Sequence, residues 1–154
     1  MCGRYTHLYT WRQIHDLLEA FLTSMHSALA GAPDPDHTPG PSYNVPPKAT
    51  VPIIKLDDGA LTPAAMQWWL VPHWSKSPDA RYATFNARSE DAHTKPAFRS
   101  AFRRGRCLIP VSGFYEWQKL STPGTPPKKA PHYITRADSQ PLLFAGLCDT
   151  WGDP

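Results

Sequence analysis

Residues 106–118 read RCLIPVSGFYEWQ, and they decide the fold that the sequence predicts. The runs 106–111 and 113–118 are rich in the β-branched and aromatic residues that favour strands, and Ser112 separates them. We therefore predict two extended segments in succession. Similar short runs lie on both sides of this stretch, which indicates a protein dominated by β-structure.

Two pairs of neighbouring runs have the pattern of β-hairpins. VPIIKL at 51–56 and a segment around 64–71 flank the turn residues Asp57, Asp58 and Gly59. HYITRA at 132–137 and PLLFAGL at 141–147 lie on either side of Asp138, Ser139 and Gln140. Because such residues favour tight turns, we expect each pair to be hydrogen-bonded across its turn.

Residues 10–29 have the period of one long amphipathic helix. Its apolar residues recur at three- and four-residue steps and so share one face: Trp11, Ile14, Leu18, Phe21 and Met25, widened by Leu17 and Leu22. Thr10 followed by Gln13 has the form of a capping box, which marks the start of the helix. We expect the apolar face to pack into the core.

The predicted fold class is α+β, a mostly antiparallel sheet or barrel-like structure with one long N-terminal helix. The 154 residues fit a single domain, 1–154, with proline-rich loops at about 31–41 and 121–131. The last residues, CDTWGDP, follow an apolar strand that has no successor. The sequence therefore predicts a domain that is truncated at its C-terminal end.

Composition narrows the class of protein. The net charge of +3 is compatible with a nucleic-acid partner without demonstrating one. The sequence has no apolar run of membrane-spanning length and no signal peptide, so we expect an intracellular protein that does not enter a membrane. Three cysteines without a CxxC pair favour neither a disulfide framework nor a zinc site. We expect no metal, no cofactor and a monomer.

Cys2 is a candidate nucleophile. Removal of Met1 would leave a thiol and a free α-amine on adjacent carbons, and this aminothiol condenses with aldehydes to a five-membered thiazolidine. The α-amine titrates near 7.7–8.0, so part of it is neutral and nucleophilic at physiological pH. Taken alone, Cys2 is better explained as a small residue beside a start codon.

Five ordered blocks resemble the SRAP family, named for SOS response-associated peptidases. The blocks are CGRYT at 2–6, SYNVPP at 42–47, MQWWLVPHW at 66–74, FNARSED at 85–91 and FRSAFRRGRCLIPVSGFYEW at 98–117. FAGLCDTW at 144–151 resembles a sixth family motif, FAGLWE.W. The resemblance covers nearly the whole chain.

The resemblance implies a role for each matching residue. Cys2 matches the family's nucleophile, Asn86 the asparagine that positions its amine, and Glu116 the general acid and base. Arg4 and Arg88 match arginines that hold DNA phosphates, and Trp74 and Pro46 match apolar residues that wedge beside the lesion. Without the resemblance, Asn86 fits a turn, the arginines and Glu116 an exposed surface, and Trp74 a core.

The sequence also departs from the family pattern. Gln67 and Trp69 replace the arginine and glycine of the RWGL motif, and a tryptophan needs space that a tight glycine site lacks. The family's IH.RMP histidine has no counterpart in these 154 residues, and we assign its role to none of the seven histidines present.

Three functions remain open at this point. The resemblance favours a protein that links Cys2 covalently to abasic sites in single-stranded DNA and removes its own Met1. A cysteine peptidase acting on other proteins would use the same residue. An inactive, truncated binder of single-stranded DNA would need only the arginines and aromatic side chains.

Overall fold

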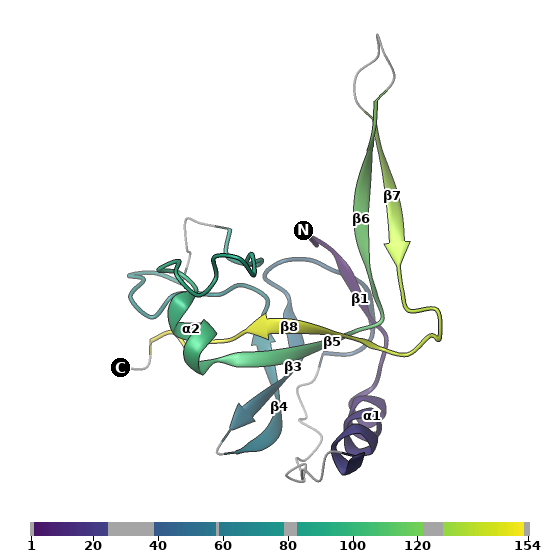
Figure 1. Ribbon diagram of the computed structural model, residues 1–154. Helices are drawn as coiled ribbons and strands as arrows, with labels where there is room; N and C mark the ends of the chain where they lie inside the picture. The colour runs from purple at the N-terminus through teal and green to yellow at the C-terminus, as the bar shows by residue number, and fades with distance from the viewer. Residues whose placement is uncertain (1, 25–38, 58, 79–82, 122–127, 153–154) are drawn as a thin grey trace.

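The computed structural model describes residues 2–24, 39–57, 59–78, 83–121 and 128–152 (Figure 1). Ten elements follow one another along the chain: β1 (Tyr5–His7), α1 (Trp11–Ser24), β2 (Ser42–Val45), β3 (Thr50–Asp57), β4 (Ala60–Gln67), α2 (Arg99–Arg104), β5 (Arg106–Val111), β6 (Gly113–Leu120), β7 (Lys128–Ile134) and β8 (Leu142–Leu147).

The strands form two four-stranded sheets. One has the order β2-β1-β6-β7 and the other the order β4-β3-β5-β8, and the strand pairings are antiparallel. The mostly antiparallel α+β class is therefore confirmed. The barrel-like closure is not: within the described residues each sheet has two open edges, so the sheets stay separate.

The stretch 106–118 joins the two sheets. Its first run is β5, in one sheet, and its second run begins β6, in the other. Ser112 lies between them, where its backbone N–H donates to Thr6 O at 2.8 Å and its hydroxyl accepts from Leu8 N at 2.9 Å. These bonds fasten β1 to the crossing point.

The main core lies between the two sheets, and a second core lies under α1. Ile53 and Ile54 of β3 are adjacent, so their side chains point to opposite faces of the sheet. Ile53 joins the first core with Tyr5 and Val111, whereas Ile54 contacts the helix. β3 is thus buried on both faces, which explains its continuous apolar run.

Helix α1 begins as the sequence predicts. Thr10 N donates to Gln13 Oε1 at 2.9 Å and Gln13 N donates to Thr10 Oγ1 at 3.3 Å, which is the predicted capping box. Trp11, Ile14 and Leu18 are buried. The described helix ends at Ser24, and the predicted remainder, 25–29, together with the side chains of Phe21, Leu22 and Met25, lies outside the described residues. The structure supports the start of the predicted helix and not its length.

The first predicted hairpin is confirmed. β3 pairs with β4 from Thr50–Gln67 to Asp57–Ala60, and Gly59 in the turn has φ +82°, which glycine adopts without strain. β4 begins four residues earlier than the predicted segment and ends at Gln67. Residues 68–71 are not part of the strand.

The second predicted hairpin is wrong. β7 pairs with β6 and β8 pairs with β5, so residues 135–141 cross between sheets. β7 also begins at Lys128, inside the predicted loop 121–131, of which 122–127 lie outside the described residues. The predicted loop 31–41 likewise lies outside them up to residue 38. β6 and β7 together form an arm that extends away from the rest of the molecule (Figure 1).

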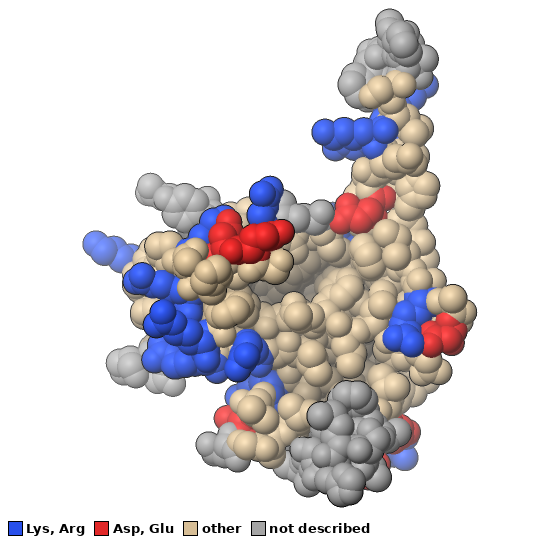
Figure 2. Space-filling model, in the orientation of Figure 1, with Lys and Arg blue, Asp and Glu red and all other residues tan. Residues whose placement is uncertain are grey.

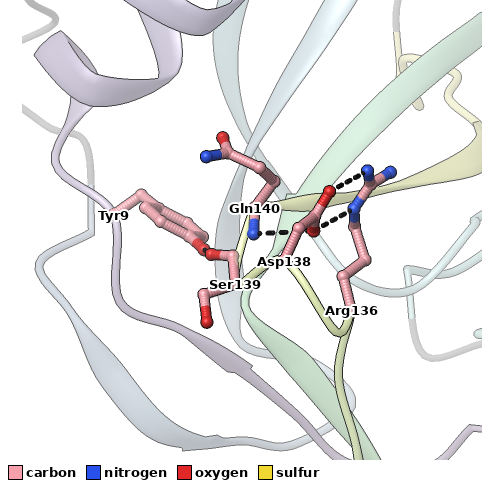
Figure 3. A network of polar contacts seen from close by, with 5 residues as sticks. All are labelled: Tyr9, Arg136, Asp138, Ser139 and Gln140. Atoms are coloured by element: carbon pink, nitrogen blue, oxygen red, sulfur yellow. Dashed lines mark hydrogen bonds and ion pairs between the residues drawn. The ribbon is translucent and has the colours of Figure 1, made fainter.

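The crossing segment is held by its own polar contacts (Figure 3). Arg136 donates through Nε to Asp138 Oδ1 at 2.8 Å, and the same carboxylate oxygen accepts from Gln140 N at 3.1 Å. Ser139 has φ 58°, and its carbonyl accepts from the Tyr9 hydroxyl at 3.1 Å. The turn that resembled a hairpin is therefore tied to the segment leading into α1.

Replacing Ile54 with alanine tests the packing of α1 on β3. Ile54 is 1% exposed, and removing a buried isoleucine side chain lowers the free energy of unfolding by about 2–5 kcal/mol. Leu56 of the same strand is 64% exposed, so Leu56→Ala should lower it by about 0.5 kcal/mol or less. Urea unfolding measures both. Equal losses in the two variants would contradict the assigned core.

Candidate active site

Cys2 precedes β1 and is half-buried against the core between the sheets. Its Sγ donates a hydrogen bond to Arg4 O at 3.2 Å, within the same N-terminal turn. Burial is the main cause that raises the pKa of the Cys2 thiol, and the negative charge of Glu116 raises it further. At neutral pH the thiol is therefore largely protonated and needs a base.

Asn86 holds the backbone of Cys2. Its Nδ2 donates to Cys2 O at 2.6 Å, across 84 positions of sequence. The preceding residue, Phe85, is anchored in turn, because its carbonyl accepts from Trp68 Nε1 at 2.8 Å and its ring packs against the Trp68 ring, with centroids 5.9 Å apart. The loop that carries Asn86 is thus fixed by aromatic packing. Asn86 and Cys2, predicted to act together, lie in direct contact.

Glu116 lies on β6 near the base of the arm and is half-buried. Its register partner on β7 is His132. The negative charge of the Glu116 carboxylate raises the pKa of the Cys2 thiol. The predicted acid–base residue therefore acts on the predicted nucleophile through its charge, across 114 positions of sequence.

Cys2 and Asn86 line a cavity of about 400 Å³. The strand residues of its wall come from the β4-β3-β5-β8 sheet, apart from Tyr5 of β1, and many of them are apolar, including Val51, Ile53 and Phe144. This cavity gives the Cys2 thiol a bounded space in which a small group of a larger molecule can be received.

The two predicted phosphate-binding arginines have different surroundings. Arg4 donates from Nη1 to Asn44 Oδ1 at 3.0 Å, which orients its guanidinium. Arg88 is exposed, and its carbonyl accepts from Asp91 N and Ala92 N in the loop after Asn86. Sequence reasoning missed Asn44 as the partner of Arg4, although Asn44 lies within the quoted SYNVPP motif.

The two predicted wedge residues lie on different parts of the surface. The Trp74 side chain is 53% exposed, and its Nε1 donates to Pro96 O at 3.4 Å. Pro46 borders a second hollow of about 160 Å³ together with His7 and Ser42. The exposure of Trp74 fits a residue that contacts a partner rather than a core residue.

The departures at Gln67 and Trp69 are accommodated without strain. β4 stays paired with β3 up to Gln67, whose Nε2 donates to Lys48 O at 3.3 Å. Trp69 is not among the described residues with positive φ, so its backbone does not require glycine. Its ring packs on Phe85, with centroids 5.6 Å apart, and Lys48 Nζ lies 5.2 Å from its centre. Trp69 thereby becomes part of the cavity wall.

One group within the described part of the chain has the donor types of a metal site. His15 Nδ1 lies 3.8 Å from Asp16 Oδ1 and 3.9 Å from Glu19 Oε2 on α1. The two carboxylates are exposed, and none of the three residues lines the cavity beside Cys2. No helix in the described ranges is long and apolar enough to cross a membrane.

The fold and the site define an α+β protein with two antiparallel sheets, in which an asparagine amide binds the backbone of a cysteine near the N-terminus and the charge of a glutamate raises the pKa of its thiol. The family model described as SOS response associated peptidase (SRAP) matches residues 1–154, and the chain belongs to this family. The family predicted from the motifs is therefore confirmed.

Named relatives and a solved structure agree with this assignment. The chain is 34% identical over 154 residues to the abasic site processing protein YoqW of Bacillus subtilis, and covers 62% of that protein. It is 31% identical over 143 residues to the abasic site processing protein HMCES of Xenopus tropicalis, with 74% of this chain and 41% of HMCES covered. A phage-related protein from Bordetella bronchiseptica has a TM-score of 0.68 at 31% identity, with 95% of this chain and 60% of that chain covered. The chain thus spans about 60% of the length of YoqW and of the Bordetella protein.

The effect of Glu116 on Cys2 predicts the direction of a pH shift. In the wild-type protein the Cys2 thiol titrates above its ordinary value near 9.0. Glu116→Gln removes a negative charge, so the pKa of Cys2 falls and more thiolate is present at pH 8. Alkylation of Cys2 by iodoacetamide, followed by mass spectrometry of its peptide, should accelerate by about two- to tenfold.

Glu90→Gln is the matched control, because Glu90 is an exposed carboxylate in the loop after Asn86. Its alkylation profile should match that of the wild type. A slower or unchanged reaction in Glu116→Gln would contradict the proximity of Glu116 and Cys2.

Proposed function

We propose that this chain processes abasic sites by joining Cys2 to the aldehyde of the opened abasic sugar in single-stranded DNA. The observation that carries the proposal is the 2.6 Å hydrogen bond from Asn86 to the backbone of Cys2, at the wall of a cavity and within the field of Glu116. The relatives named abasic site processing proteins support the same substrate.

The reaction begins after Met1 has been removed by hydrolysis of its peptide bond. The α-amine of Cys2 adds to the aldehyde carbon, and loss of water gives a Schiff base. The Cys2 sulfur then bonds to the same carbon while its proton passes to the nitrogen, which closes a thiazolidine ring. Neither a thiol nor an amine alone forms this ring, so the position of cysteine at the new N-terminus is essential to the chemistry.

We assign the proton transfers to Glu116, whose charge acts on the Cys2 thiol. As a carboxylate it accepts a proton from the attacking amine, and as a carboxylic acid it returns one to the hydroxyl that leaves as water. The raised pKa of Cys2 makes a nearby base necessary for the sulfur step as well. Asn86 leaves the amine free to react, because it binds the carbonyl oxygen of Cys2.

The DNA strand would be held by cations and aromatic side chains. Arg4 follows Cys2 by two residues, and Arg88 follows Asn86 by two. Each guanidinium group can bind two phosphate oxygens at once. Lys and Arg side chains also gather around α2, and the face between α2 and the arm is hollowed (Figure 2). The α2 region contributes Arg99, Arg103 and Arg104. Exposed Trp74 offers a ring on which a base can stack.

The covalent step can be tested with an oligonucleotide that contains one abasic site. The wild-type protein should give a product that survives denaturing electrophoresis, and Cys2→Ala should lose the thiazolidine. Glu116→Gln should slow product formation by about 10²–10⁴-fold, as removal of a general acid–base residue does.

Cys148→Ser provides the matched control, since Cys148 lines the same cavity without an adjacent amine. It should retain the product. Absence of a stable product from the wild-type chain, or an equal yield with an oligonucleotide lacking the abasic site, would refute the proposal.

The mode of DNA binding gives a separate prediction. Affinity for a labelled single strand should exceed affinity for duplex and should fall between about 50 and 200 mM salt, because phosphate contacts release counterions. Trp74→Ala should weaken single-strand binding by about five- to hundredfold, whereas Trp74→Phe keeps a stacking ring and most of the affinity. Fluorescence anisotropy measures each affinity. Equal binding of duplex and single strand by the wild type would rule out the role of Trp74.

A further inference from the structure

The two cysteines other than Cys2 lie on one face of the sheet that contains β5 and β8. Cys107 of β5 is the register partner of Gly146 on β8, and Cys148 follows Gly146 by two residues. Cys148 N donates to Gly105 O at 2.6 Å, so the ladder continues past the end of β8. Because side chains two residues apart on a strand point to the same face, the Cys107 and Cys148 side chains are diagonal neighbours.

The packing around these side chains brings the two sulfur atoms together. A β-carbon added at Gly146 would lie 2.7 Å from Cys107 Sγ, so the thiol occupies space that only a glycine leaves open. Cys148 packs against the core cluster to which the buried Cys107 belongs. The two thiols form a hydrogen bond with each other across the strand pair. The fold thus holds two sulfur atoms within reach of a common bond.

The surroundings make the two thiols chemically different. The hydrogen bond from the Cys107 thiol lowers the pKa of Cys148, although burial opposes this change. The positive charge of Lys55, the register partner of Cys107 on β3, lowers the pKa of Cys148 further, and the charge of Asp149 acts against it. The same hydrogen bond, together with burial, raises the pKa of the Cys107 thiol. Cys148 is therefore the nucleophile of the pair, and Cys107 holds the proton.

Cys148 also differs from Cys2. The Cys2 thiol has a raised pKa, mainly through burial, and donates to the carbonyl of Arg4. Cys148 is half-buried and lines the cavity beside Cys2, where a small reagent can reach it. Because a thiolate reacts with oxidants much faster than a thiol does, an oxidant that enters the cavity reacts with Cys148 before Cys2.

We propose that Cys107 and Cys148 are a redox-active thiol pair, which hydroperoxides convert to a reversible disulfide. The Cys148 thiolate attacks one oxygen of hydrogen peroxide and displaces hydroxide, which leaves a sulfenic acid on Cys148. The Cys107 sulfur then bonds to the Cys148 sulfur, and its proton leaves with the sulfenic hydroxyl as water. The pair gives up two electrons and one proton, and the peroxide is reduced to one water and one hydroxide ion.

This modification site goes beyond the proposed function, because Cys2 takes no part in it. The three cysteines line one cavity, so oxidation at Cys148 consumes the oxidant beside Cys2 and leaves the Cys2 thiol unmodified. A dithiol reductant attacks the disulfide and restores both thiols. The pair thereby spares the candidate nucleophile under oxidising conditions.

Peptide mapping of the reduced chain tests the proposal directly. After trypsin digestion the three cysteines lie in separate peptides, residues 1–4, 107–119 and 137–154. The chain is treated with hydrogen peroxide at neutral pH, and the remaining thiols are blocked with N-ethylmaleimide before digestion. Mass spectrometry should find peptides 107–119 and 137–154 joined, and dithiothreitol should separate them. The peptide that contains Cys2 should carry N-ethylmaleimide at the same peroxide dose.

Two variants separate the steps of the reaction. Cys148→Ser removes the nucleophile, so its Cys107 should keep a free thiol under the same treatment. Cys107→Ser keeps a hydrogen-bond donor beside Cys148 but cannot form the disulfide. The reaction should therefore stop at the sulfenic acid, and dimedone should label Cys148 about tenfold more in this variant than in the wild type.

Oxidation of the chain unfolded in urea is the control for the folded geometry. The unfolded chain should lose the selectivity and also give links that include peptide 1–4. Failure of the folded wild type to join peptides 107–119 and 137–154 would overturn the inference. So would a main product that links Cys2, or Cys148→Ser oxidised at Cys107 as readily as the wild type. None of these measurements involves DNA, so they stand apart from the test of the proposed function.

Discussion

The crossing of the chain from one sheet to the other at Ser112 is the constraint on which the site depends. β5 and β6 are consecutive, so the end of one sheet fixes the start of the other, and Ser112 binds β1 through Thr6 and Leu8. With β1 held there, Tyr5 is the register partner of Phe114 on β6. Cys2 precedes Tyr5 by three residues and Glu116 follows Phe114 by two, so the pairing brings both to the same end of the strand pair. The position of Glu116 relative to Cys2 thus follows from the pairing of β1 with β6.

Local signals in the sequence located several elements well. The bounds of β5, the start of β6, the capping box of α1 and the β3–β4 turn each depend on residues a few positions apart, which a sequence displays directly. The strand and hairpin predictions failed where the structure of a segment depends on which strand it pairs with. Lys128–Ile134 is a strand because it lies beside β6, with Pro131 opposite Trp117, although its lysines and proline resemble a loop. The turn at Asp138–Gln140 has hairpin composition, but its flanking strands bind different partners.

The candidate site also has parts that the sequence predicts and parts that only the fold reveals. Cys2, Asn86 and Glu116 were found through motifs. The motifs implied that Asn86 positions the amine of Cys2, whereas the contact in the structure is with the Cys2 carbonyl. The cavity could not be predicted, since its wall gathers residues from segments that reach from Cys2 to Trp151. Trp69 shows the limit most clearly. As a departure from a glycine motif it needed space that a tight glycine site lacks, and the folded chain keeps β4 paired and places the indole in the cavity wall.

The raised pKa of the Cys2 thiol follows from its place against the core between the sheets. Burial withholds the water that would stabilise the thiolate, and the negative charge of Glu116 opposes ionisation further. A fully exposed thiol would ionise more readily, but water would compete with every bond to the substrate. Holding Cys2 half-buried, with its carbonyl bound by Asn86, keeps the residue at the cavity wall while part of it packs against the core.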